Sequence, residues 1–281
     1  MTQDLAEKLD RQRAFWRREN HDRPVIGFNG SYFSTDTVQL IGREQGRVEP
    51  EDIIVERILD YTESEYTAWR DCTGDLFWTA AQLYQFRWLA AAIGAPVFSG
   101  GDSIWVEPFI ADYRDLDAID ISPKGLWVQK LWQLTDAMVE HAAGRYPVAA
   151  NEFMSPLSAL VDLRGNTDFA FDLYDRPDDV RRGLSRFTEL WSSFVTAQYR
   201  RIPEWYGGYT SAQRFIWAPG RISEFSEDPV FMFSPHFHQE IVLGSHCLVP
   251  RQVEYLTFTC TRPSFILSII CWLWTDCRQL S

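Results

Sequence analysis

Short apolar runs alternate with longer amphipathic stretches between residues 20 and 243. Near-helical spacing of apolar residues among charges predicts an opening helix from Leu5 to Trp16. The same kind of spacing predicts further helices over residues 50–70, 82–93, 124–143 and 178–200. The apolar runs predict buried strands over residues 24–28, 75–78 and 146–151, and a hairpin over residues 96–107.

This strand–helix alternation predicts parallel strands joined by crossover helices. The two common closures are an open doubly wound sheet and a barrel of eight βα units. Neither Gly-x-Gly-x-x-Gly after the first strand nor Gly-x-x-x-x-Gly-Lys occurs, so both nucleotide-binding signatures are absent. We therefore expect an α/β fold of the (β/α)8 TIM-barrel type, with the functional site on loops at the carboxyl ends of the strands.

Composition narrows the classes of partner. The chain of 281 residues is 46% hydrophobic and 23% charged, as is typical of a folded protein. Its net charge of -12 disfavours nucleic acid and an anionic membrane surface, because both attract a basic face. The first residues lack the apolar segment and cleavage site of a secretory signal. We expect a cytoplasmic protein with a small-molecule substrate, no nucleic-acid or membrane partner, and a homodimer as the assembly to test.

Two stretches carry recognisable patterns. Residues 151–165 read NEFMSPLSALVDLRG, in which a Pro-x-Ser pattern leads into a helix that ends in a charged residue and glycine. Residues 222–243 form a Ser- and Asp-rich loop followed by the Ser234-Pro235 start of a helix. Both stretches, in this order, resemble segments of the uroporphyrinogen decarboxylase superfamily, and the resemblance extends over residues 10–243.

The resemblance implies a (β/α) barrel that acts on a bound small molecule. Its main implication is a carboxy-lyase, a decarboxylase of a small acidic, porphyrinogen-like substrate that needs no cofactor. An alternative within the same fold is a zinc-dependent, corrinoid methyltransferase-like protein. Two alternatives come from other classes: a glycoside hydrolase that uses two carboxylates, and an inactive truncated fragment.

The chain departs from both named activities. The decarboxylases carry an arginine pair after the first strand, where this chain has residues 29–33 and then no arginine until Arg43. They place a tyrosine where this chain offers Val161 or Asp162.

The methyltransferases need His and Cys ligands for zinc, and no cysteine lies near His236 or His238 in the sequence. We read both histidines as residues on the surface of a helix.

The resemblance stops after residue 243, and the composition changes at the same place. Four of the five cysteines lie in residues 244–281, which also hold the apolar run 265–274. This run is shorter than the ~20 residues that span a bilayer. It is either a buried terminal strand or part of a tail foreign to the barrel, as a frameshift, retained intron or truncated gene model would produce. We therefore divide the chain into a partial barrel, residues 1–243, and an atypical Cys-rich hydrophobic tail, residues 244–281, so the barrel is expected to be incomplete.

Carboxylates at predicted strand ends are the catalytic candidates, because burial can raise a carboxyl pKa into the range of acid–base catalysis. Asp75 opens the second strand, although it can equally be a turn or cap residue. Glu152, with Asn151, ends a predicted strand just before the loop of the first family-like segment. Glu224 and Asp228 lie with Glu227 in the second segment, which can also be an ordinary solvated loop, and Asp228 can be an N-cap. A glycoside hydrolase would use Glu152 and Glu224.

The substrate-binding candidates come from three places. Asn29 and Tyr32 stand where the resemblance places the arginine pair. Asp102 follows two glycines, which favours a hairpin tip over a substrate contact. Arg164 and Arg221 are the basic candidates for an acidic substrate group.

Overall fold

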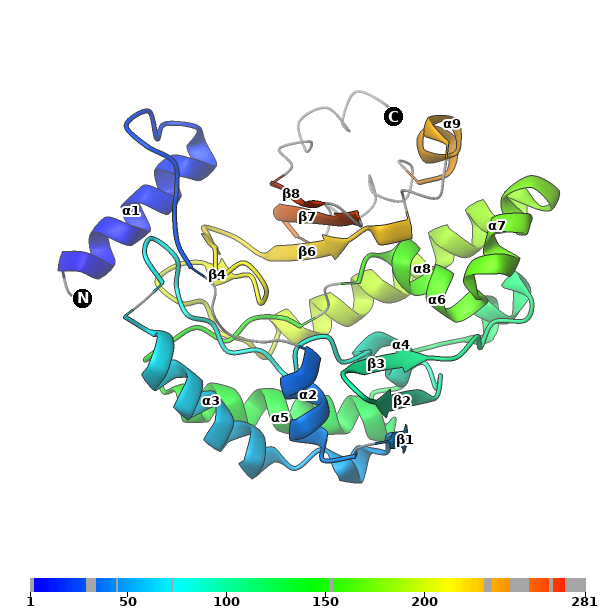
Figure 1. The fold of residues 1–281 in the computed structure, drawn as a ribbon, viewed down its shortest axis with the longest axis horizontal. Helices are drawn as coiled ribbons and strands as arrows, with labels where there is room; N and C mark the ends of the chain where they lie inside the picture. Colours follow the sequence, from blue (N-terminus) through cyan, green and yellow to red (C-terminus); the bar gives the residue numbers. More distant parts are fainter. Residues whose placement is uncertain are drawn as a thin grey trace.

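The computed structural model describes residues 3–28, 34–43, 45–71, 73–151, 154–229, 234–242, 253–262 and 265–270. It is a mixed α/β structure in which long helices surround small sheets (Figure 1). Three candidate residues, Asn29, Tyr32 and Glu152, lie outside the described residues.

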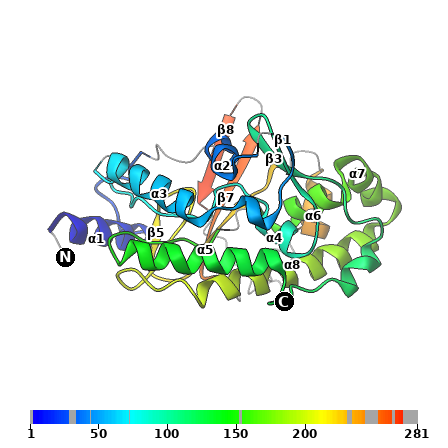
Figure 2. The same ribbon diagram turned by 90° about the horizontal axis from the view of Figure 1, so that it is seen from below.

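The predicted long helices are present. They are α1 Gln3–Arg17, α3 Val55–Trp69, α5 Leu126–Ala142 and α8 Pro177–Tyr199. The other helical segments are α2 Ser34–Ile41, α4 Trp88–Ala92, α6 Pro156–Arg164, α7 Asn166–Asp175 and α9 Pro235–Phe237, with 3-10 turns at Pro50–Asp52 and Tyr113–Ala118 and a π-helical turn at His238–Val242. In Figures 1 and 2, α3 lies beside α5, and α6 beside α8.

Local sequence explains where the first family-like segment becomes helical. Ser155 precedes α6, and its Oγ accepts a hydrogen bond from the Ser158 backbone N–H at 2.9 Å. Pro156 occupies the first turn, where its missing N–H leaves no bond unmade. Gly165, with a φ of 89°, ends the helix in a conformation that side chains disfavour. The predicted Pro-x-Ser helix is therefore confirmed.

The predicted hairpin is also confirmed. Strand β2 Val97–Gly100 pairs antiparallel with β3 Ser103–Val106, and β1 Gln45–Arg47 adds a third strand in the order β1-β2-β3. A second small sheet consists of β4 Tyr209–Thr210 and β5 Trp217–Ala218, which are antiparallel.

Parallel neighbours follow one another in chain order across the centre of the molecule. Ala80 forms a parallel bridge with Val148, and Met154 forms one with Ser226 at the end of β6 Ile222–Ser226. Strand β6 then pairs in parallel with β7 Tyr255–Arg262. We call residues 75–80, residues 146–151 with Met154, β6 and β7 the strand array. The first two segments contain single bridges and no regular strand, so the strands predicted over residues 75–78 and 146–151 are not confirmed.

The strand array is an open row of neighbouring segments and does not close into a barrel. Strand β8 Phe265–Ile270 runs antiparallel to β7, which ends the succession of parallel neighbours. Among the described residues no closed barrel forms, so only the α/β class of the expected (β/α)8 architecture is confirmed. Residues 24–28 were expected to be a buried strand, but Ile26 and Phe28 are 55% and 72% exposed. The segment touches the array mainly through Asp75, whose N–H donates to the Ile26 carbonyl at 2.9 Å.

The main core lies between the strand array and the helices. Trp191 of α8 packs edge-on against Phe225 of β6, with ring centroids 5.2 Å apart. Trp88, Trp191 and Trp217 are among the largest fully buried side chains, in line with a packing role for the tryptophans. Within the described residues, no helix combines the length and the apolar character needed to cross a membrane.

Candidate functional site

Glu224 points into the interior of the strand array. Successive side chains of a strand face opposite sides, and Phe225 faces α8 through its contact with Trp191. Glu224 therefore lies on the other face of β6, and it is only 3% exposed. The sequence pattern predicted a charged loop here, which is wrong: residues 222–226 form a strand, and Glu224 and Glu227 are both buried.

Three neighbours hold the Glu224 carboxyl group. The Gln213 backbone N–H donates to Oε2 at 2.6 Å, and the Thr257 hydroxyl lies 3.4 Å from Oε1. The Arg214 Nε lies 3.8 Å from Oε1, too far for a close ion pair. Burial raises the pKa of Glu224 to about 7, and the Arg214 charge and the hydrogen bonds only partly oppose this effect. At neutral pH this carboxyl group can therefore both give up and accept a proton.

The loop between β4 and β5 brings Gln213 and Arg214 to this carboxyl group. The Ser211 N–H bonds to the Ile216 carbonyl at 2.9 Å and closes the loop. Ala212 packs with Ala81 and Ala149, which lie at the carboxyl ends of two neighbouring strands. The small side chains allow the loop to enter the array between the strand ends.

A second loop places Tyr84 beside the same group. Leu83 and Gln85, on either side of Tyr84, have left-handed φ angles of 52° and 62°. Each costs ~1–2 kcal/mol in a residue with a side chain, and such strain gathers at functional sites. Burial, with the nearby Glu224 charge, raises the pKa of Tyr84 to about 12, so the phenol keeps its proton.

Further polar groups lie at the carboxyl ends of the strands. Arg87 contacts the Met154 sulfur at 3.1 Å and lies 3.8 Å from Asp162 on α6. Burial raises the pKa of Asp162, which the Arg87 charge opposes and the Asp228 charge reinforces. The Ser226 hydroxyl donates to Asp228 at 3.3 Å. Asp228 therefore lies at the same edge of the array as Glu224. Among the described residues, no direct contact joins Asp228 to Glu224.

Asp75 does not lie where a catalytic acid or base is expected. It lies in a turn at the amino end of residues 75–80, where Arg23 forms a two-pronged ion pair with it, one bond being Nη2–Oδ1 at 2.8 Å. The Ile26 N–H donates to Asp75 at 2.9 Å, and Arg11 lies 3.8 Å away. These partners, Arg23 first, lower the pKa of Asp75. This geometry attaches the N-terminal segment and does not suit a general acid or base.

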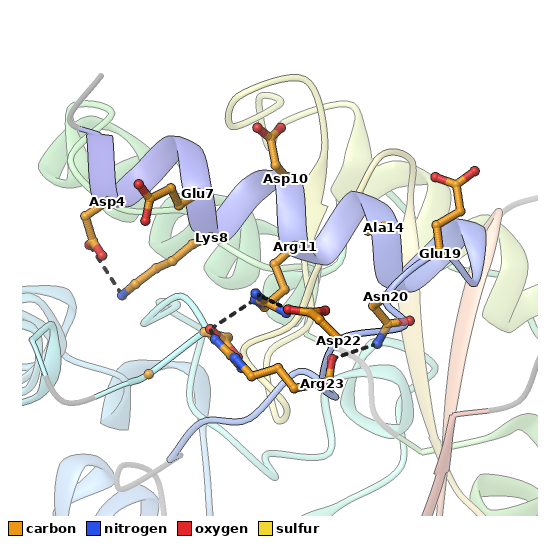
Figure 3. Close-up of a pocket in the computed structure, with 12 residues that line it drawn as sticks. Asp4, Glu7, Lys8, Asp10, Arg11, Ala14, Glu19, Asn20, Asp22 and Arg23 are labelled. Carbon is orange, nitrogen blue, oxygen red and sulfur yellow. Dashed lines mark hydrogen bonds and ion pairs between the residues drawn. The ribbon is translucent and has the colours of Figure 1, made fainter.

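Figure 3 shows this amino-end region, where a cavity of about 600 Å³ lies between α1 and the segment that follows it. Beneath α1, the Gln12 Nε2 donates to the Asp75 carbonyl at 2.6 Å. The Trp217 N–H donates to Gln12 Oε1, so one buried glutamine joins α1 to two distant segments. The cavity is thus on the opposite side of the strand array from Glu224, at its amino edge.

The remaining described candidates do not join the Glu224 site. Asp102 is exposed at the tip of the β2–β3 hairpin. Arg164 donates to Asp172 at 2.7 Å and to the Ala111 carbonyl at 2.9 Å, so the protein itself occupies its guanidinium group. Arg221 stands at the amino end of β6, and its backbone N–H donates to Glu254 at 2.7 Å. Neither arginine is positioned to bind a substrate at the carboxyl edge.

Sequence reasoning missed Tyr84, Gln213, Arg214 and Thr257. Gln213 acts through its backbone N–H, which no side-chain pattern reveals. Thr257 lies in the tail that was set apart from the barrel, yet it contacts Glu224. Within the described ranges, His, Cys, Asp and Glu nowhere gather in a group of three or more that could hold a metal ion.

Comparison with protein-family models found no match, and neither did comparison with curated protein sequences. Among solved structures, the chain is similar to a methyltransferase from Methanosarcina mazei, with a TM-score of 0.62 at 13% sequence identity. The similarity covers 90% of this chain and 69% of that chain. The chain therefore shares the fold of a methyltransferase over almost its whole length.

Proposed function

We propose that this chain is a methyltransferase-like enzyme in which Glu224 transfers a proton as a methyl group moves between small molecules. The observation that carries the proposal is the buried Glu224 carboxyl inside the strand array, with its pKa raised to about 7. The shared fold favours the methyl-transfer alternative over the decarboxylation that the sequence resemblance mainly implied.

The step balances as follows. A nucleophilic acceptor, such as a thiolate, forms a bond to the methyl carbon of an O-, N- or S-methyl donor. The bond from that carbon to the donor heteroatom breaks, and the heteroatom takes the bonding electrons. Protonated Glu224 gives its proton to this heteroatom, so the leaving group departs neutral. The Glu224 carboxylate then takes the proton of the next thiol acceptor, which restores the acid and forms the thiolate for the next transfer.

Two neighbours suit this role. Arg214, at 3.8 Å, stabilises the carboxylate once its proton has left without holding it so tightly that reprotonation fails. Tyr84 keeps its own proton and can donate a hydrogen bond within the site.

Zinc, which the corrinoid methyltransferase resemblance implies, needs three or more gathered ligands. Within the described part of the chain His, Cys, Asp and Glu form no such group, so zinc is given no role in the step at Glu224.

The test uses the full chain and substitutes Glu224→Gln, which keeps the shape and removes the ionisable group. Donors with a 13C-labelled methyl group are incubated with thiols, with and without a reduced corrinoid, and NMR follows the label. We expect Glu224→Gln to lower kcat by about 100-fold or more, the lower range for general acid–base catalysis. Glu56→Gln, an exposed change on α3, serves as the matched control and should leave the rate unchanged.

The pH dependence provides a second readout. Because Glu224 acts as an acid, kcat/KM calculated on the concentration of ionised thiol should be constant at low pH and fall as pH rises through about 7. In parallel, 13C-carboxyl acids are assayed for release of labelled CO2. Release of CO2 without methyl transfer, or full activity of Glu224→Gln, would contradict the proposal.

A further inference from the structure

Gln82 carries a buried amide that the described protein does not use. The side chain is 0% exposed, and neither Oε1 nor Nε2 has a hydrogen-bond partner among the described residues. Buried amides are almost always hydrogen-bonded. The backbone carbonyl of the same residue, by contrast, accepts bonds from Trp88 Nε1 at 2.6 Å and from Asn151 Nδ2. The idle groups are therefore a donor and an acceptor of one planar amide.

A second buried glutamine, Gln198, also has a polar atom without a partner in the described part of the chain. Gln198 of α8 is also 0% exposed, and its Oε1 accepts from the Asn151 backbone N–H at 2.8 Å. Its Nε2 has no partner within the described part of the chain. Asn151 thus links the backbone of Gln82 to the side chain of Gln198, so the idle amide of Gln82 and the idle Nε2 of Gln198 belong to one hydrogen-bonded cluster.

The backbone around Gln82 is held in a strained and well-fixed form. Leu83 and Gln85 are left-handed, Asn151 Nδ2 donates to the Leu83 carbonyl at 3.0 Å, and Thr37 donates to the Tyr84 carbonyl. Strain of this kind persists only where the surroundings enforce it, as at ligand sites. The same loop places Tyr84 beside Glu224, and Gln82 precedes Tyr84 by two residues in the chain.

We propose that Gln82, assisted by Gln198, recognises a substrate through a carboxamide or lactam edge. The ligand N–H would donate to Gln82 Oε1, and its carbonyl would accept from Nε2, which is the pairing that one planar amide offers another. A carboxylate is a poorer match because it offers no N–H to Oε1 and brings an unpaired charge into the interior. The inference rests on the proposed function in taking the carboxyl edge as the ligand site, and it adds the substrate class.

The first experiment measures thermal unfolding of Gln82→Met, which has similar volume and no amide. If the amide is idle in the free chain, this variant should melt at a higher temperature than the original chain. Gln12→Met is the matched control, because Gln12 is equally buried but both ends of its amide are bonded to Asp75 and Trp217. Gln12→Met should melt at a lower temperature. A lower melting temperature for Gln82→Met would show that its amide is already satisfied and would overturn the inference.

The second experiment measures binding of 2-pyrrolidinone and N-methyl-2-pyrrolidinone by saturation-transfer NMR titration. The original chain should bind the lactam at least 5-fold more tightly than its N-methyl form, which lacks the donor. Gln82→Met should abolish this preference, whereas Glu224→Gln should retain it. Equal binding of the two probes, or an unchanged preference in Gln82→Met, would overturn the inference. Because neither readout needs turnover, a lactam preference without methyl transfer would reject the proposed function and leave this recognition in place.

Discussion

Asp75 and Glu224 are both buried carboxylates beside arginines, yet their pKa values shift in opposite directions. Arg23 approaches Asp75 with two nitrogens, and this short pairing outweighs the cost of burial. Arg214 stays 3.8 Å from Glu224, so burial dominates there. The distance and geometry of the cation, rather than its presence, thus decide which carboxyl group fixes structure and which can move protons.

This difference predicts how stability depends on pH at Glu224. A raised folded-state pKa contributes stability that is complete below the unfolded value near 4.5 and is lost as pH rises through about 7. Glu224→Gln imitates the protonated form and escapes this loss. The variant should match the original chain near pH 4.5 and exceed its unfolding free energy by roughly 3 kcal/mol above pH 7. Urea unfolding across this range tests it, with Glu56→Gln as the control, and a constant difference at all pH values would contradict it.

At the scale of elements, two sequence patterns were misread because tertiary contacts changed them. Residues 82–93 have the composition of a helix, but only Trp88–Ala92 is helical. Asn151, Trp88 and Thr37 bind the carbonyls of residues 82–84 and hold the loop in a non-helical path. Residues 222–226 are polar enough for a loop, but pairing with β7 makes them a strand.

The strained loop gives a prediction at this scale. Gln85 has a φ of 62°, which glycine adopts without the cost that a Cβ imposes. Gln85→Gly should therefore be more stable than Gln85→Ala by up to about 1 kcal/mol. Chemical unfolding of the two variants measures the difference in their unfolding free energies. Because both variants lack the glutamine side chain, the contacts of that side chain do not affect the comparison. Equal stabilities would mean that the loop is not strained.

At the scale of the whole molecule, residues 253–257 of the tail are integrated with residues 1–243. Strand β7 pairs along the length of β6, and Val253 and Leu256 are buried at 0% and 1% exposure. Glu254 accepts from the Arg221 N–H at 2.7 Å, and Tyr255 packs against Trp16 with ring centroids 4.6 Å apart. The division at residue 243, made on composition, stays a prediction about the origin of the tail.

These contacts predict the effect of removing residues 244–281. The shortened chain would expose the edge of β6 and the apolar surface under Val253 and Leu256, which favours association between chains. Light scattering after size exclusion should show aggregates, and the thermal transition should become broad. A monomeric shortened chain with the same sharp transition as the full chain would show instead that the tail is dispensable for folding.

The sequence by itself determined the features that depend on nearby residues. The spacing of apolar positions predicted α1, α3, α5 and α8, and the glycines predicted the β2–β3 hairpin, because helix faces and tight turns are encoded within a few residues. The Pro-x-Ser pattern of the family resemblance likewise predicted α6. Strand–helix alternation also indicated the α/β class, which the shared methyltransferase fold supports.

Only the tertiary structure decided how the site is assembled. Glu224 was selected from the sequence, but its burial depends on β7, and its partners come from residues 213, 214 and 257. Asp75 carried the same chemical signal, and its position at the amino end of the strand array, against Arg23, gave it a different role. Desolvation and charge pairing depend on which distant segments meet, and the spacing of residues along one chain does not specify those meetings.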